Sequence, residues 1–506
     1  MFSIILVVFL GVTQQVVGQH DTHFKPNRSV IVHLFEWKFN DVANECEKFL
    51  GPRGYGGVQL SPVNENIIIS KENISRPWWE RYQPMSYKIL TRSGGEDEFL
   101  DMTKRCNKAG VRIYVDVVFN HMAVPNSEMN GTAGSIANGS QFYYPAVPFT
   151  KDNFHKSCVI DKYTDAHVIR NCMLGELPDI DHSQSDVQAK IVSFLNRLVE
   201  LGAAGFRVDA AKHMWPLDLQ KIYDKVKNLN TEFDFPQNAR PFIYQEVIDL
   251  GGEPISKTEY NHMGAVTEFL AGVRIGTVFN GNAPLTALIN WGPAMGLLPH
   301  RDALIFVDNH DNQRGHGAGG AMILTHKKPK TYRMATAFLL AHPFGIPRIM
   351  SSYSFNSTDQ GPPCDENGEI LSPLMKDDDG ECDGDWVCEH RWNAFANLVE
   401  FRRVSGNATL TNWQDNGANQ IAFCRSDKAF IAFNADSKLD YDVSPFACVE
   451  AGDYCDIISG KILDNRSGCT GKVVKISTNK TAKIVIPAND EYGVVAIHAE
   501  SKIGKK

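Results

Sequence analysis

Eight short apolar runs, rich in β-branched residues, recur along the first 354 residues of the chain. Most are separated by segments with helical periodicity, such as 96–109, 185–201 and 332–341. Continuous apolar strands that alternate with helices are typical of a parallel sheet covered on both faces. Eight such units predict a closed (β/α)₈ barrel, an α/β fold. The runs span 29–36, 56–62, 111–121, 204–213, 241–248, 265–270, 303–311 and 346–354.

Two regions depart from this alternation. Residues 122–182 are rich in Gly, Asn, Ser, Tyr and Pro, and we interpret them as an irregular domain inserted after the third strand. Beyond residue 408 the helical pattern stops, and short apolar runs alternate with turns. This predicts a C-terminal antiparallel sandwich or Greek-key domain over 408–506. The barrel itself would then comprise 19–121 and 183–407.

The N-terminus and the cysteines indicate a secreted protein. Residues 1–18 hold an apolar run of about nine residues, too short to span a bilayer but long enough for a signal peptide, which we expect to be cleaved before Gln19. Eleven cysteines at short spacings suit local disulfides. We therefore expect an extracellular glycoprotein without a membrane anchor. Eight N-x-S/T sequons begin at Asn27, Asn73, Asn130, Asn138, Asn356, Asn407, Asn465 and Asn479.

Overall charge argues against polyanionic partners. The net charge is -8, which provides no positive field for nucleic acid or for an anionic membrane surface. We expect no nucleic-acid or membrane partner, and a monomer.

Charged and polar residues gather where the predicted strands end. In GFRVDAAKHMWP (205–216), an apolar strand runs directly into several of them, although buried charges are costly unless they are paired. The active site of a (β/α)₈ barrel lies at the C-terminal ends of its strands, so this placement favours a site over structural pairing. The residues concerned are Asn120, His121, Arg207, Asp209, Lys212, His213, Glu246, Asn309, His310, Asp311 and Arg348.

Three carboxylates from different strands fit glycosyl transfer. Asp209, Glu246 and Asp311 would converge without a Cys/His cluster that could hold zinc. Glycosidic cleavage needs one carboxylate as nucleophile or charge stabiliser and one carboxylic acid to protonate the leaving oxygen. Spacing by itself does not show which residue has which role.

The motifs that carry these residues resemble those of the α-amylase clan of glycoside hydrolases. The matching segments are DVVFNH, FRVDAAKH, YQEVIDLGGE and FVDNHD, in the family's order. RPWWERYQP, NQRGHGAGG and VVAIHAESK are similar to animal α-amylases in particular. The resemblance implies an endo-acting hydrolase of starch, glycogen and malto-oligosaccharides that retains anomeric configuration. Asp209 would be the nucleophile, Glu246 the acid/base and Asp311 the transition-state stabiliser.

The resemblance also implies a row of sugar contacts. Two adjacent tryptophans are ordinarily core residues, but Trp78 and Trp79 follow the second strand in a polar loop, where stacking on sugar rings is the better interpretation. Arg207 would in addition keep Asp209 ionised. The implied sugar contacts are Trp78, Trp79, Tyr82, Gln83, His121, Arg207, Lys212, His213, His310 and His316.

Two ions are expected by the same resemblance. A calcium ion would bind Asn120, Asp179 and the carbonyls of Arg170 and His213, all hard oxygen donors. A chloride ion would be held by Arg207, Asn309 and Arg348. The alternative for the arginines is pairing with protein carboxylates.

Disulfide pairing follows the family pattern, which joins Cys46 to Cys106, Cys158 to Cys172, Cys382 to Cys388, and Cys455 to Cys469. Cys364, Cys424 and Cys448 stay unassigned, and a pair between two of them is possible.

Two other functions are compatible with parts of this pattern. An exo-acting α-glucosidase or transglycosylase would share the carboxylates but differ in its loops. A carbohydrate-binding relative without activity should lack one of the three carboxylates, and this chain has all three.

Overall fold

The computed structural model describes residues 19–71, 74–124, 128–376 and 380–504. Within these residues eight parallel strands close into a barrel, as the apolar pattern predicts. β1 pairs with both β2 and β15, which closes the circle. The predicted signal peptide, 1–18, lies outside the described residues. The barrel strands are β1 (Ile31–Leu34), β2 (Gly57–Leu60), β8 (Arg112–Val117), β11 (Gly205–Val208), β12 (Phe242–Gln245), β13 (Ala265–Thr267), β14 (Ala303–Ile305) and β15 (Ile346–Ser351).

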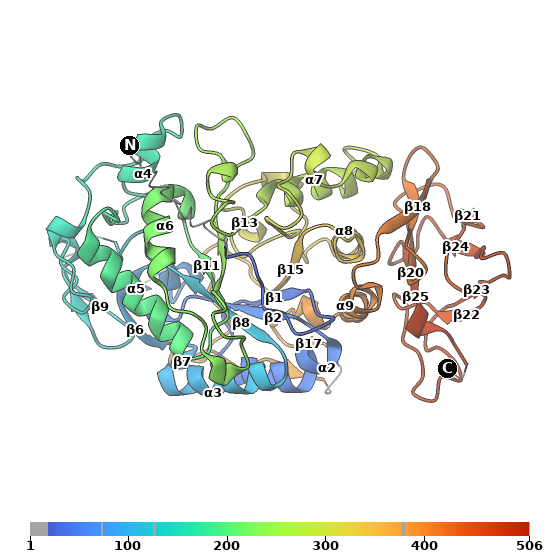
Figure 1. The fold of residues 1–506 in the computed structure, drawn as a ribbon, viewed down its shortest axis with the longest axis horizontal. Coiled ribbons are helices and arrows are strands. Elements are labelled where there is room, and N and C mark those ends of the chain that lie inside the picture. The colour runs from blue at the N-terminus through green and yellow to red at the C-terminus, as the bar shows by residue number, and fades with distance from the viewer. Residues whose placement is uncertain (1–18, 72–73, 125–127, 377–379, 505–506) are drawn as a thin grey trace, which may run out of the picture.

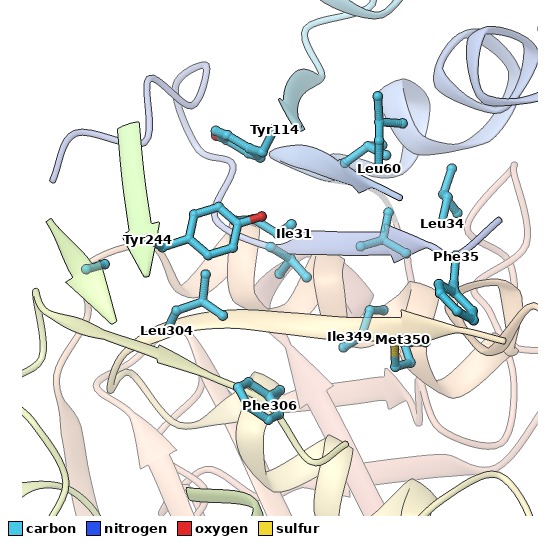
Figure 2. Close-up of a cluster of buried hydrophobic side chains, with 14 of the residues drawn as sticks. Ile31, Leu34, Phe35, Leu60, Tyr114, Tyr244, Leu304, Phe306, Ile349 and Met350 are labelled. Atoms are coloured by element: carbon cyan, nitrogen blue, oxygen red, sulfur yellow. The ribbon is translucent and has the colours of Figure 1, made fainter. Parts of the chain in front are cut away.

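Side chains from these strands fill the barrel interior. Figure 2 shows Ile31, Tyr244 and Leu304 among these side chains, and each is fully buried. Strands buried on both faces need apolar residues at consecutive positions, which is why the runs show no alternation. Gly205 is required by close approach, because a Cβ there would lie 2.1 Å from the Phe242 carbonyl oxygen.

Helices cover the outside of the barrel. In α5 the buried residues Val187, Ile191, Phe194 and Leu198 recur at helical spacing and form one apolar stripe. At the start of α3 the Glu98 carboxylate accepts the Gly95 N–H, which satisfies a free donor of the helix terminus. The helices are α1 (Phe39–Glu45), α2 (Gly51–Arg53), α3 (Glu96–Lys108), α4 (Ala166–Asn171), α5 (Ser185–Glu200), α6 (Pro216–Lys225), α7 (Phe269–Phe279), α8 (Pro329–Ala341) and α9 (Asn393–Ser405).

Short hairpins extend from the barrel. The region between β8 and α5 contains α4, a two-stranded hairpin and two short 3-10 turns, joined by irregular segments. It lies at the end of the molecule away from the C-terminal domain (Figure 1). The short strands are β3 (Asn64–Asn66), β4 (Ser70–Lys71), β5 (Ile74–Ser75), β6 (Pro84–Thr91), β7 (Gly94–Gly95), β9 (Met129–Asn130), β10 (Ile136–Ala137), β16 (Leu374–Met375) and β17 (Cys382–Asp383).

The C-terminal region is all-β and packs beside α8 and α9 (Figure 1). Its four-stranded sheet has the order β18-β19-β20-β25, and two further pairs join β21 to β24 and β22 to β23. In β19, Ile421 and Phe423 belong to the core shared with the barrel, whereas Ala422 and Cys424 face a separate core. Both faces of the sheet are therefore buried. The strands are β18 (Leu410–Asp415), β19 (Gln420–Arg425), β20 (Ala429–Asn434), β21 (Tyr441–Val443), β22 (Gly452–Cys455), β23 (Val473–Ile476), β24 (Ile484–Ile486) and β25 (Val494–His498).

The disulfides agree with the family pattern and extend it. All four expected pairs are present, and Cys424 bonds to Cys448, which settles the pairing that the sequence left open. Cys364 is a free, exposed thiol. Among the described residues, no helix is long and apolar enough to cross a membrane.

Candidate active site

A cleft of 510 Å³ opens at the C-terminal ends of the barrel strands. Asp209 follows β11, Glu246 follows β12, and Asp311 lies beyond β14. All three carboxyl groups line this cleft, so the fold brings together the residues that the sequence singles out. Other expected residues that line it are Trp78, Trp79, Tyr82, His121, Lys212 and His213.

Arg207 contacts two of the three carboxyl groups, those of Asp209 and Glu246. It is 1 % exposed and does not itself line the cleft. Its Nη1 donates to Asp209 Oδ1 at 2.8 Å, and its Nη2 lies 2.6 Å from Glu246 Oε1. The second oxygen of Glu246 accepts the Ala210 N–H at 2.9 Å. One planar guanidinium thus fixes both carboxyl groups relative to each other.

Asp116 is a fourth carboxyl group of the site, and the sequence analysis did not assign it. It is fully buried within β8 and accepts Arg207 Nη1 at 2.6 Å and the Tyr82 hydroxyl at 3.0 Å. An acid inside the apolar strand VRIYVDVV was the available signal, because a buried carboxylate requires a partner.

Asp311 completes the carboxyl cluster. His310 Nε2 lies 3.2 Å from Asp311 Oδ2, and Asn309 Nδ2 donates to the same oxygen at 3.4 Å. Burial, and next the charge of Glu246, raise the pKa of Asp311 to about 7. Burial also raises the pKa of Asp209 well above its ordinary value, against the opposing effect of Arg207.

The cluster therefore holds more acid than base. Asp116, Asp209 and Glu246 contact one cation, Arg207, whose charge also acts on the nearby Asp311. Burial lowers the pKa of His310 well below its ordinary value, so that imidazole adds no charge at neutral pH. Burial and the repulsion between like charges accordingly raise the pKa values of Asp116, Asp209 and Asp311.

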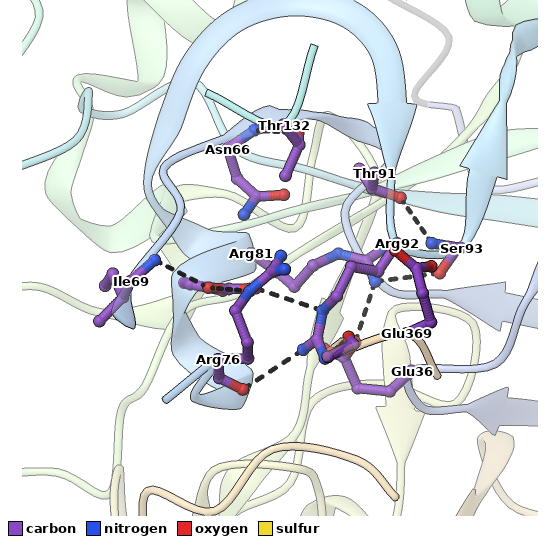
Figure 3. A network of polar contacts seen from close by, with 12 residues as sticks. Glu36, Asn66, Ile69, Arg76, Arg81, Thr91, Arg92, Ser93, Thr132 and Glu369 are labelled. Carbon is purple, nitrogen blue, oxygen red and sulfur yellow. Dashed lines mark hydrogen bonds and ion pairs between the residues drawn. The ribbon is translucent and has the colours of Figure 1, made fainter. Parts of the chain in front are cut away.

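An ion-pair network surrounds the turn that carries the two tryptophans, and Figure 3 shows its members Glu36, Arg76, Arg81 and Arg92. The tryptophans belong to a 3-10 turn, η2 (Trp78–Tyr82), whose Glu80 pairs with Arg76 and Arg92, and whose Arg81 pairs with Glu36 at 2.9 Å.

The two tryptophans differ in burial. Trp78 is 4 % exposed and its indole N–H donates to the Thr358 carbonyl, whereas Trp79 is half-buried and donates to Asp359 Oδ1 at 3.0 Å. Trp78 is thus largely a core residue with one face on the cleft, and Trp79 offers more of its ring.

Lys212 also lines the cleft. It ion-pairs with Glu253 and donates to the Ile248 carbonyl at 2.8 Å, and its ammonium lies 5.1 Å from the centre of the Tyr163 ring. Three further cleft residues were not predicted from the sequence: Tyr163, Ile248 and Glu253. Glu253 lies within the quoted motif YQEVIDLGGE, but a solvated acid in a Gly-rich loop gives no signal of its own.

Three remaining expected sugar contacts lie around the cleft rather than in its lining. His310 stacks on Tyr82 with ring centres 5.1 Å apart. Gln83 is buried and accepts the Val124 N–H at 3.1 Å. His316 is exposed beside Trp78, with ring centres 5.9 Å apart, on the glycine-rich segment that lines the cleft at Gly317.

The four residues expected to bind calcium form two neighbouring pairs. Asn120 and Asp179 are close because an isolated antiparallel β-bridge pairs His121 with Asp179. The Ile180 N–H also donates to the Asn120 carbonyl. Asn120 Oδ1 is buried and accepts no hydrogen bond. Arg170 lies in the last turn of α4, and the preceding carbonyl, of Ile169, contacts His213 Nδ1 at 3.1 Å. Among the described residues no group of three or more His, Cys, Asp or Glu is suited to a metal, so any such site would need amide and carbonyl oxygens besides the Asp179 carboxylate.

Arg348, in β15, differs from Arg207 in its partners. Its Nη1 donates to Gln59 Oε1 at 2.7 Å, but its Nε and Nη2 are buried without a hydrogen-bond partner. Among the described residues it forms no ion pair, and burial lowers its pKa. The alternative of pairing with carboxylates therefore holds for Arg207 and does not hold for Arg348.

Comparison with known proteins now places the chain. Residues 57–258 match the α-amylase catalytic domain, and residues 411–500 match the α-amylase C-terminal all-β domain. An α-amylase of Tribolium castaneum is 49 % identical over 504 residues, which cover 99 % of this chain and all of the relative. The chain belongs to the α-amylase family. It is a glycoside hydrolase.

Other relatives agree with this assignment. An α-amylase-related protein of Drosophila willistoni is 50 % identical over 99 % of both chains. The crystal structure of α-amylase I from Eisenia fetida matches with a TM-score of 0.89 at 40 % identity, covering 96 % of this chain and 99 % of that one. A mutant of the Eisenia enzyme was solved in complex with maltohexaose.

Proposed function

We propose that the protein is an endo-acting α-amylase that hydrolyses internal α-1,4 bonds of starch, glycogen and malto-oligosaccharides with retention. The observation that carries this proposal is one cleft in which Asp209, Glu246 and Asp311 face the same space between aromatic and polar walls. The maltohexaose bound to a mutant of the Eisenia relative supports a linear glucan as substrate.

Asp209 is suited to be the nucleophile. One of its oxygens accepts Arg207, while the other accepts no hydrogen bond from the described residues. That oxygen would attack the anomeric carbon and form a glycosyl-enzyme ester. Arg207 favours the carboxylate form of Asp209 against the effect of burial, as its opposing influence on the pKa of Asp209 indicates.

Glu246 is suited to be the acid and then the base. It would protonate the glycosidic oxygen as that bond breaks, and afterwards take a proton from the water that hydrolyses the ester. Its attachment to the same guanidinium as Asp209 supports the short carboxyl separation of retaining enzymes, about 5 to 5.5 Å.

Asp311 and the histidines would stabilise the reacting sugar. Asp311 would bind hydroxyl groups of the distorted ring, and His121, which lines the cleft, and His310, which adjoins Asp311, offer neutral imidazoles for hydrogen bonds. Burial lowers the pKa of His121 to about 4, so it is neutral at physiological pH.

Endo-action is supported by cleft-lining residues beyond the three carboxyl groups. Trp79 and Trp78 would stack on sugars, and Lys212 and Tyr163 would contact further sugars along the cleft. A chain bound along the whole cleft would be cut internally. An exo-acting α-glucosidase or a transglycosylase remains the alternative that product analysis separates from this proposal.

A calcium ion fits the residues between the inserted region and the barrel. Asn120 Oδ1 and the Asp179 carboxylate, with the carbonyls of Arg170 and His213, would hold it. The unpartnered Asn120 oxygen and the buried Asp179 are the oxygen donors that calcium prefers. When bound, the ion would fasten residues 122–182 to the barrel beside the cleft, so we propose this segment as a calcium-binding domain.

A chloride ion fits beside Arg348. The two unpartnered buried nitrogens of Arg348 would donate to it, together with Arg207 and Asn309. A bound anion would offset the Arg348 charge close to the carboxyl cluster and so favour the protonated acid that catalysis requires. We also propose a secreted monomer, for which the five disulfides are supporting evidence.

The decisive experiment is hydrolysis of a long glucan by the purified protein, with product lengths and the anomeric form of the new ends recorded. Short malto-oligosaccharides in the α-form, absent with Asp209→Asn, are the expected result. Glucose released from one end would point to the exo-acting alternative. No hydrolysis with calcium and chloride present would overturn the proposal and favour a binding protein.

A further inference from the structure

A second cavity, of 680 Å³, lies at the opposite end of the barrel from the active-site cleft. Ser29 precedes β1, His300 precedes β14, and Gly345 precedes β15, so the cavity opens at the N-terminal ends of these strands. Arg402 and Arg425 close it from α9 and β19. It therefore lies where the barrel meets the C-terminal domain.

The lining of this cavity is strongly cationic. It contains Arg28, Arg402, Arg403, Arg425 and His300, and among the described residues no carboxylate lines it. Arg403 is balanced by ion pairs with Glu400 and Glu500. Among the described residues, Arg28, Arg402 and Arg425 form no ion pair, so three guanidinium charges around one cavity are not neutralised by the protein.

The two most buried of these arginines bond to neutral oxygen atoms. Arg402, 7 % exposed, donates to the carbonyls of Leu340, His342, Pro343 and Gly345 and to the Ser29 hydroxyl. Carbonyl dipoles satisfy hydrogen bonds but do not cancel a net charge.

Arg425 is held in the same way. It is 2 % exposed and donates to the carbonyls of Ala341, Ala408 and Gly406. Burial lowers the pKa of Arg402 to about 9 and that of Arg425 to about 10, and Arg425 depresses the pKa of Arg402 further. Among the described residues, no negative charge near Arg402 or Arg425 offsets the lowering of their pKa values.

The rim has donors left for a ligand. Arg28 is half-buried and makes one hydrogen bond, from Nη1 to the Tyr55 carbonyl, which leaves its Nη2 and Nε without partners among the described residues. His300 accepts the Gly345 N–H on Nδ1, so its Nε2 is open to a donor role. Asn27 and Asn407 stand at the exposed edge.

We propose that this cavity binds an oxyanion, either free phosphate or sulfate or the phosphate or sulfate group of a small metabolite. Uncompensated guanidinium charge favours a dianion, and the guanidinium fork matches two oxygens of a tetrahedral group. The bound anion would accept hydrogen bonds from Arg425 and from Arg28 of the N-terminal segment, and Arg402, whose five N–H groups are all used, would attract it by charge alone. It would thereby stabilise the junction between the barrel and the C-terminal domain, independently of catalysis at the distant cleft.

The test is equilibrium binding of inorganic phosphate to the full-length protein by calorimetry, at fixed chloride concentration and ionic strength. Asn27 and Asn407 begin sequons at the rim, so any N-glycans are first removed enzymatically. We expect one phosphate per chain and a rise in Tm with phosphate. Arg28→Gln should weaken binding about tenfold, because it removes a charge-assisted contact but keeps the sequon.

Arg274→Gln is the matched control. Arg274 is exposed and, like Arg28, donates to one carbonyl, that of Met295, but it does not line the cavity. It should leave phosphate affinity unchanged. No saturable binding, or equal weakening by both substitutions, would overturn the proposal, as would wild-type affinity in Arg28→Gln. Tighter binding of a sugar phosphate than of phosphate would identify a metabolite as the ligand.

Discussion

Replacement of Asp311 by Asn should abolish hydrolysis and yet stabilise the folded protein at neutral pH. The pKa of this carboxyl rises from 3.8 to about 7 on folding, chiefly through burial and then through the charge of Glu246. The folded state therefore holds a proton between about pH 4 and pH 7 that the unfolded chain releases, and stability falls as the pH rises through this window. The amide of Asn does not titrate, so the variant should not lose stability through this titration as the pH rises.

The size of the effect follows from the shift. About three pKa units correspond to roughly 4 kcal/mol once the pH exceeds 7. The Asp311 side chain is 21 % exposed, so solvent screening reduces the expected gain to about 2 to 4 kcal/mol. Asp311→Asn loses few favourable contacts that would reduce this gain in stability. His310 is neutral and forms no ion pair with Asp311, and the amide oxygen of the new side chain still accepts the hydrogen bond from Asn309. At pH 4 the two proteins should differ by less than about 1 kcal/mol.

Urea unfolding of the wild type and Asp311→Asn at about pH 4.5 and pH 7.5, with calcium fixed, measures this difference on either side of the titration. The free energy of unfolding of the variant should increase relative to that of the wild type as the pH rises. The variant should also hydrolyse starch at least about a hundredfold more slowly than the wild type. Asp186→Asn is the control. Asp186 is exposed and paired with Lys190, which lowers its pKa, so its replacement should give a small effect of the opposite sign. A stability difference that is independent of pH would refute the reasoning.

Three further outcomes are expected. Removal of chloride should lower the rate of starch hydrolysis, and Arg348→Gln should abolish the response to added chloride; an unchanged response would exclude Arg348 from an anion site. Chelation of calcium should lower the Tm of the wild type. Asn120→Ala should have a lower Tm before chelation and a smaller decrease on chelation, because it lacks the buried amide oxygen. Equal decreases in the two proteins would argue against Asn120 as a calcium ligand. Trp79→Ala should raise KM for long malto-oligosaccharides about three- to tenfold with kcat nearly unchanged. Trp78→Ala, at a 4 % exposed position, should in addition cost about 3 to 5 kcal/mol of stability, measured by urea unfolding, and equal stability of the two variants would contradict this distinction.

Much of the fold could be predicted from the sequence because its signals are local. Strands buried on both faces, such as Gly205–Val208, appear as unbroken apolar runs, and amphipathic helices such as Ser185–Glu200 appear at a spacing of three to four residues. The carboxylates Asp209, Glu246 and Asp311 could be placed in one cleft because the C-terminal ends of barrel strands always meet at one face. These predictions need no knowledge of distant contacts.

The partners of each charged group depend on residues far apart in the chain. Asp116 contacts Arg207, which lies 91 residues later in the chain, so no local pattern indicated its role. The pairing of Cys424 with Cys448 was likewise open, since three candidates had no local preference.

The sequence by itself determined the barrel, the C-terminal β domain and the identity of the three carboxyl groups that share the cleft, because burial and periodicity act within each element. Only the tertiary structure decided which charges are compensated: Arg207 has three carboxyl partners, whereas Arg348 and Arg402 have none among the described residues. The physical reason is that desolvation and pairing depend on distances across the fold, which spacing along the chain does not encode.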